Sequence, residues 1–131
     1  MSVEQNKAVV RRLIELTNLG DNDLWFKFVD ENFADVYIFH DPSYAGFERG
    51  PEGFKKWFRH IQSTSTGTGT HTVEDMFGEE DKVATRYIYH YTDETGKSGA
   101  FWSISIMHFL GGKIADEWNV TAPLESAPTA S

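Results

Sequence analysis

The sequence contains no cysteine and few basic residues among its 131 amino acids. Without cysteine the chain can form no disulfide, no thiol nucleophile and no cysteine-ligated metal site. Lys and Arg total 12 against 20 Asp and Glu, which gives a formal charge of −8 at pH 7. This balance argues against nucleic acid or anionic membrane as a partner, because both require clustered positive charge.

Long apolar stretches are also missing. No run approaches the roughly 18 apolar residues that a membrane-spanning helix needs. The first residues, Met-Ser-Val-Glu-Gln-Asn-Lys, lack the apolar centre of a secretion signal. We therefore expect a cytoplasmic protein with one folded domain over residues 1–122, followed by a flexible Pro-, Ala- and Ser-rich tail at 123–131.

Three segments show the apolar spacing of α-helices. Residues 2–19 start with the Ser-x-x-Gln of a capping box and end before Gly20. A shorter second helix follows a cap at Asp21 or Asn22. Pro51 opens the third helix, whose apolar face combines Phe54, Trp57, Phe58 and Ile61.

The rest of the chain has the pattern of β-strands. The first strand is expected from Val36 to Asp41, where Pro42 ends it. Further strands are expected over residues 70–77, 82–91, 99–110 and 113–120. Three helices with most strands after them predict an α+β fold, with the helices packed on one face of a mostly antiparallel sheet.

The polar run Gln-Ser-Thr-Ser-Thr-Gly-Thr-Gly at residues 62–69 has nothing apolar to bury. We expect it to be a mobile connector between the third helix and the second strand, with a lid over a binding site as the alternative.

Asp41 is the one acid placed at the end of a strongly apolar strand. Alternation puts its side chain on the same face as Tyr37 and Phe39. An acid in aromatic surroundings could serve as a proton-abstracting base, because burial raises the pKa of a carboxyl group. The alternative is a turn-forming Asp-Pro pair whose carboxylate bonds a nearby backbone N–H.

The order of these elements resembles the nuclear-transport-factor-2-like superfamily, and within it the SnoaL-like polyketide-cyclase branch. The resemblance covers residues 3–122 and rests on the segments 50–54, 73–75, 81–84 and 112–119. It implies a cone-shaped α+β barrel in which the curved sheet encloses an apolar pocket. This fold hosts isomerases, cyclases, epoxide hydrolases, dehydratases and binding domains, so the fold alone does not define an activity.

The resemblance allows the known mechanisms to be compared residue by residue. Asp41 matches the general base of ketosteroid isomerases, but Leu13 and Met107 stand where those enzymes have their oxyanion donors. The acid/base Asp of SnoaL-type cyclases is matched by Asn119, and their Gln and His donors by Ser103 and Ser105. The Arg-x-Asp of limonene-epoxide-hydrolase-type enzymes is absent, since Arg86 is followed by Tyr and Ile. Each known reaction lacks at least one of its groups.

The resemblance also implies which residues line the pocket. Besides the candidate base Asp41, we expect Trp25, Phe39, Tyr44, Phe54, Phe58, His71, Ser103, Ser105, Met107, Glu117 and Asn119. Of these, His71, Asn119 or Tyr44 could donate hydrogen bonds to a developing oxyanion. Arg86 lies on the face of its strand opposite to Tyr87, Tyr89 and Tyr91. It could meet an anionic ligand or pair with a neighbouring carboxylate.

The opposite face of the fourth expected strand carries Trp102, Ile104, Ile106 and His108. If the polar residues of that strand face the pocket, this apolar face is an association surface, and the resemblance implies a homodimer through the sheet. The alternative is that Ile104 and Ile106 belong to the core.

The five histidines show neither His-x-His nor His-Glu-x-x-His spacing, so we expect neither a metal nor a cofactor. Two functions remain. One is a cofactor-independent isomerase, cyclase or dehydratase that uses Asp41 on a small lipophilic molecule. The other is a ligand-binding or protein-interaction domain that has lost its catalytic residues.

Overall fold

The computed structural model describes residues 2–64 and 67–124. Within these ranges the helices are α1 (Val3–Leu19), α2 (Asn22–Asn32) and α3 (Gly50–Thr64), with a short 3-10 turn at Pro42–Tyr44. The strands are β1 (Phe33–His40), β2 (Thr68–Glu79), β3 (Lys82–Thr92), β4 (Ser98–Leu110) and β5 (Lys113–Pro123).

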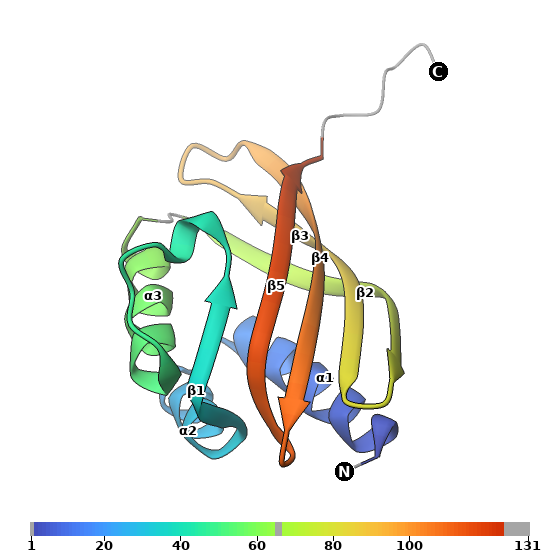
Figure 1. Cartoon of the computed structure of the whole chain (residues 1–131). Helices are drawn as coiled ribbons and strands as arrows, with labels where there is room; N and C mark the ends of the chain where they lie inside the picture. The colour runs from blue at the N-terminus through green and yellow to red at the C-terminus, as the bar shows by residue number, and fades with distance from the viewer. Residues whose placement is uncertain (1, 65–66, 125–131) are drawn as a thin grey trace.

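The strands form one curved sheet in the order β1-β5-β4-β3-β2. β1 runs parallel to β5, and the other neighbours are antiparallel. All three helices lie on the concave side: α1 crosses β2 and β3, whereas α2 and α3 gather beside β1 (Figure 1). The predicted α+β fold is confirmed, with the sheet open between β1 and β2 instead of closed into a barrel.

The helix starts follow the capping residues. The Ser2 hydroxyl accepts from the backbone N–H of Gln5 at 3.1 Å, and Gln5 Oε1 accepts from the Ser2 N–H at 2.9 Å. α1 ends at Gly20, which has the left-handed φ of 75°. Asp21 caps α2, and α2 then leads directly into the extended Phe33. β1 consequently begins three residues earlier than the sequence predicted, because no turn intervenes.

The connector expected at residues 62–69 is shorter than predicted, since α3 reaches Thr64 and β2 begins at Thr68. The hydroxyls of Ser63 and Thr64 donate to the His60 carbonyl at 2.7 and 3.2 Å, so these polar side chains find partners within the last turn of the helix. Residues 65–66 lie outside the described residues. So does most of the expected tail, as β5 extends to Pro123 and residues 125–131 are not described.

An aromatic cluster fills the space between the sheet and the helices. Phe54 on α3 is its centre, with ring centroids 4.8 Å from Phe33, 5.1 Å from Tyr37 and 5.7 Å from Phe39. Burial of such rings is the main apolar contribution to a small core. No helix of the described residues is long and apolar enough to cross a membrane.

Gly53 lets the segment before α3 press against that helix. A Cβ atom at residue 53 would overlap the backbone carbonyl oxygen of Glu48 and lie 2.8 Å from the Tyr44 hydroxyl. The same carbonyl accepts a hydrogen bond from Tyr44 at 2.9 Å. Gly53 therefore fixes Phe54 and Tyr44 relative to each other.

We expect Gly53→Ala to lower the free energy of unfolding by about 1–3 kcal/mol, because the added methyl group must push backbone aside. An unobstructed helix would instead gain up to about 1 kcal/mol from the same change. Urea unfolding gives the sign directly, and a more stable variant would contradict the close contact.

Candidate functional site

A set of polar side chains lies on the concave face of the sheet. We call the following residues the polar network: Tyr37, Asp41, Tyr87, Ser103, Glu117, Asn119 and Thr121. Register explains why they meet, since Glu117 pairs with Phe39 of β1 and with Met107 of β4, while Asn119 pairs with Ser105. Side chains of paired residues point to the same face of a sheet.

Asn119 is the branching point of the polar network. Its Nδ2 donates to Asp41 Oδ2 at 3.2 Å and to Thr121 Oγ1 at 3.0 Å. Its Oδ1 accepts from the Tyr87 hydroxyl at 3.2 Å. Because Asn119 both donates and accepts, it connects Asp41, the residue after β1, with β3 and β5 and orients the Asp41 carboxylate on the concave face.

Glu117 is buried beside this branching point. The Tyr37 hydroxyl donates to Glu117 Oε1 at 3.0 Å. Burial raises the pKa of Glu117 from 4.5 to about 7, opposed by the Tyr37 hydrogen bond and assisted by the negative charge of Asp41. Burial, followed by the charge of Glu117, also raises the pKa values of Tyr37 and Tyr87. Glu117 is therefore a carboxyl group that holds its proton up to about neutral pH. It lies close enough to Asp41 for the Asp41 charge to disfavour the ionised form of Glu117.

Three of the aromatic residues predicted to line the pocket contact one another near the end of β1. Phe39, Tyr44 and Phe54 form mutual ring contacts with centroids 5.5 to 6.5 Å apart. The Tyr44 hydroxyl is already engaged by Glu48. On β4, the small or apolar side chains Ser103, Ser105 and Met107 are buried.

Other predicted residues lie elsewhere on the concave side. Trp25 and Phe58 stack at 3.8 Å between α2 and α3, and the Trp25 indole N–H donates to Thr17 at 3.1 Å. These contacts belong to the helical layer. His71 lies on β2 against the rings of Tyr87 and Tyr89, with centroids at 5.6 and 4.5 Å.

The sequence did not single out Tyr37, Tyr87 or Thr121 as site residues. Strand alternation already placed Tyr37 on the face of Asp41, which was the available signal. The partners of Tyr87 and Thr121 depend on which strands are neighbours, and no local pattern reports that.

The convex face carries ion pairs of its own. Arg86 pairs with Glu74, which is the second of the two roles considered for it. His108 lies between Asp81 and Asp116 at 2.9 and 3.3 Å, and His40 contacts the same Asp116 at 3.2 Å. In residues 2–64 and 67–124 no three His, Asp or Glu side chains are grouped to hold a metal ion.

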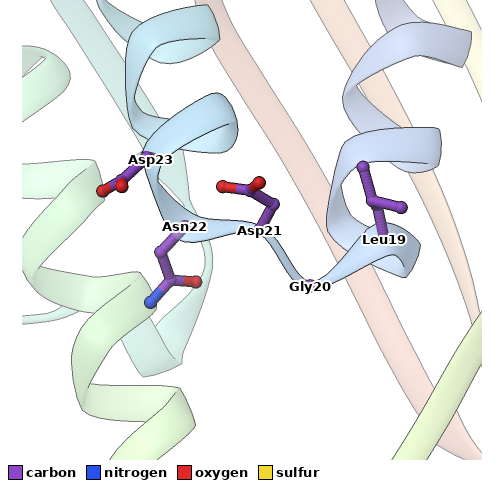
Figure 2. Close-up of a pocket in the computed structure, with 5 residues that line it drawn as sticks. All are labelled: Leu19, Gly20, Asp21, Asn22 and Asp23. Carbon is purple, nitrogen blue, oxygen red and sulfur yellow. The ribbon is translucent and has the colours of Figure 1, made fainter.

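Two surface depressions lie apart from the polar network. One, of about 520 Å³, follows the turn between α1 and α2 and is lined by Leu19, Gly20, Asp21, Asn22 and Asp23 (Figure 2). The other, of about 370 Å³, lies on the convex side and is lined by Phe77, Gly78, Glu79, Glu80, Lys82, Ala84 and Ile106. The first is shallow and mainly polar, which does not suit a lipophilic ligand. The second includes the apolar side chains Phe77, Ala84 and Ile106, but it lies on the convex side, away from Asp41.

Comparison with known protein families identifies the family of this domain. The family model of the SnoaL-like domain matches residues 10–117. The chain belongs to this family, and its nuclear-transport-factor-2-like fold agrees with the expectation drawn from the sequence. A search of curated proteins gave no match.

Solved structures share the fold at low identity. IdmH of Streptomyces antibioticus, a candidate polyketide cyclase, is 23% identical with a TM-score of 0.74, covering 89% of this chain and 91% of that chain. TsrD of Streptomyces laurentii is 22% identical with a TM-score of 0.67, covering 87% and 88%. An NTF2-like protein of unknown function from Burkholderia pseudomallei is 13% identical with a TM-score of 0.74, covering 93% and 92%.

The buried Glu117 predicts a pH dependence of stability. Because its pKa is raised in the folded state, the contribution of Glu117 to the free energy of unfolding is fully present below pH 4.5. This contribution is lost as the pH rises to about 7. Between about pH 5 and pH 8, the free energy of unfolding should fall by about 2.5 kcal/mol more in the wild type than in Glu117→Gln.

Urea unfolding at both pH values measures this difference. Burial lowers the pKa of His71 to about 4, so its contribution is present above pH 6.5 and is lost as the pH falls, which is the opposite direction. That contribution is common to both proteins and cancels in the comparison. An identical pH dependence in the two proteins would contradict the raised pKa.

Proposed function

We propose that the protein is a cofactor-independent acid–base catalyst, an isomerase, cyclase or dehydratase, that acts on a small lipophilic carbonyl compound with Asp41 as the base. One observation carries the proposal. Asp41 lies on the concave face, hydrogen-bonded to Asn119 and close enough to the buried Glu117 for its charge to raise the Glu117 pKa. Two carboxyl groups in unequal environments are a common basis for dividing acid and base roles.

In the proposed step, Asp41 removes a proton from the carbon next to the substrate carbonyl. The C–H electron pair forms a carbon–carbon double bond, and negative charge develops on the carbonyl oxygen. A proton donor near that oxygen supplies the largest stabilisation in such reactions. Glu117 suits this role, because it lies directly across the sheet from Met107, the residue that stands where ketosteroid isomerases carry a donor.

The surroundings of Asp41 favour an apolar substrate. Phe39, Tyr44 and Trp57 have ring centroids 5.0 to 6.2 Å apart beside the end of β1. Low polarity strengthens the interaction between a charged base and its neighbours. The similarity to IdmH, a candidate polyketide cyclase, agrees with a substrate of this kind.

We expect Asp41→Asn to abolish proton abstraction. The probe is 2-tetralone in deuterated buffer, and NMR follows the exchange of its α-protons. The wild type should accelerate exchange over buffer, and the variant should be slower by at least about a hundredfold, because it lacks the base.

Asp35→Asn is the matched control, since Asp35 is an exposed carboxylate on β1, the strand that leads to Asp41. It should leave exchange unchanged. If the wild type gives no exchange above buffer, or if both variants exchange equally, Asp41 is not a base for enolisable ketones.

A ligand-binding domain without catalysis is the second candidate. The buried apolar side chains Leu13 and Met107 favour it, because they stand where the resemblance puts the oxyanion donors of ketosteroid isomerases. Saturable binding of 2-tetralone without exchange would support this function over the first.

We also propose that the protein is a homodimer that uses the convex face of the sheet. Ile104 and Ile106 are each 41% exposed there, beside the exposed Trp102 and Trp118. Adjacent exposed apolar side chains on two paired strands are typical of an association surface. His108 lies at the edge of this surface between its two aspartates.

Ile104→Glu should weaken the dimer by about a hundredfold or more, because a twofold interface would bury two unpaired carboxylates. Light scattering coupled to size exclusion measures the mass. Leu19→Glu, at an exposed position on the far end of α1, is the control and should leave the mass unchanged. A wild type that is monomeric at all concentrations would refute the interface.

A further inference from the structure

Asn18 at the end of α1 binds the backbone of His71 on the edge strand β2. Its Oδ1 accepts from the His71 backbone N–H at 2.7 Å, and its Nδ2 donates to the His71 carbonyl at 2.8 Å. A backbone N–H only donates and a backbone carbonyl only accepts. The two contacts therefore fix which end of the Asn18 amide is oxygen.

The fixed amide decides where the His71 ring carries its proton. Nδ1 of the ring lies 3.3 Å from the same Asn18 Oδ1. This oxygen is an acceptor, so the favourable arrangement has the proton on Nδ1, and a lone pair there would face another lone pair. Burial lowers the pKa of His71 to about 4, so the ring is neutral at ordinary pH. Nε2 is then an unprotonated hydrogen-bond acceptor.

The ring is held in an aromatic setting on the concave face. Tyr89 lies 4.5 Å away and Tyr87 5.6 Å away between centroids. Gly69 has no side chain, and a Cβ there would overlap the Tyr89 ring, so this tyrosine lies flat across β2. Within the described residues, the His71 side chain makes one hydrogen bond, and Nδ1 is the atom that makes it. Nε2 remains as an acceptor on a ring that packs against two tyrosine rings.

Tyr87 connects this ring to the polar network. Its hydroxyl donates to Asn119, which in turn binds Asp41. A ligand that reaches Asp41 along the Tyr87 ring would therefore pass beside His71.

We infer that His71 is a specificity-determining residue that accepts, through Nε2, a hydrogen bond from a hydroxyl group of the ligand. The inference rests on the proposed small-molecule site and narrows its ligand class to hydroxyl-bearing lipophilic compounds. This direction is the reverse of the oxyanion-donor role considered from the sequence. A ligand with an ether or a keto group at that position would leave the acceptor facing another acceptor.

Two probes of similar size separate these cases, 2-naphthol and 2-methoxynaphthalene. Calorimetry should show that the wild type binds 2-naphthol about tenfold more tightly, since the methoxy compound cannot donate. In His71→Phe the ratio of the two dissociation constants should fall to about one. His90→Phe makes the same change on the exposed convex side of the neighbouring β3, and should keep the tenfold ratio.

A measurement on the unmodified protein guards against a misfolded variant. Nitrogen-15 NMR of the wild-type ring should show the proton on Nδ1. A proton on Nε2, equal binding of both probes by the wild type, or an unchanged ratio in His71→Phe would each overturn the role of His71. Failure of both probes to bind would overturn it as well, whereas Asp41-dependent exchange in 2-tetralone would still support the proposed catalyst.

Discussion

The hydrogen bonds of the Asn119 side chain hold the candidate site together. Tyr87 reaches this amide from β3 across the whole width of β4. It can do so because the intervening side chains are Ser103 and Ser105, which are small enough for the tyrosine ring to pass over. Larger residues at these two positions would keep the Tyr87 hydroxyl away from the Asn119 side chain on the concave face. Both serines thus leave room for the tyrosine ring, and Ser103 is also a member of the polar network.

Aromatic packing and acid chemistry depend on each other in this molecule. Phe54 packs on Tyr37, which contacts Glu117 in the middle of β5, and burial there is the largest cause of the raised Glu117 pKa. The Tyr37 hydroxyl then becomes necessary, because a buried carboxyl group without a partner is costly by several kcal/mol once it ionises. Gly53 belongs to the same arrangement, since it sets the distance of α3 from the segment that follows Asp41. A change in helix packing should therefore alter proton affinity at a distance.

Much of the fold was predictable from local patterns, and the site was predictable only in part. Caps at Ser2 and Asp21 marked two helices, and strand alternation placed Asp41 with Tyr37 on one face. The pairing of Tyr37 with Glu117 joins residues 80 positions apart, and it exists because β1 lies parallel to β5. Local spacing carries no information about that neighbour. The extension of α3 to Thr64 was missed because Ser63 and Thr64 have weak helix preference and show no apolar spacing, although their hydroxyls bond the helix backbone.

The amide of Asn18 has a further consequence, which concerns solubility. β2 is an edge strand, and its outward N–H and C=O groups form a template on which a strand of another chain could be added. At His71 the Asn18 side chain occupies both groups, in the manner of a short piece of a neighbouring strand. α1 therefore ends in a side chain that shields the edge of the sheet from intermolecular pairing. Proteins usually protect such edges with charged residues, proline or a β-bulge. Here the carboxamide of Asn18 blocks the backbone N–H and C=O of one residue, His71.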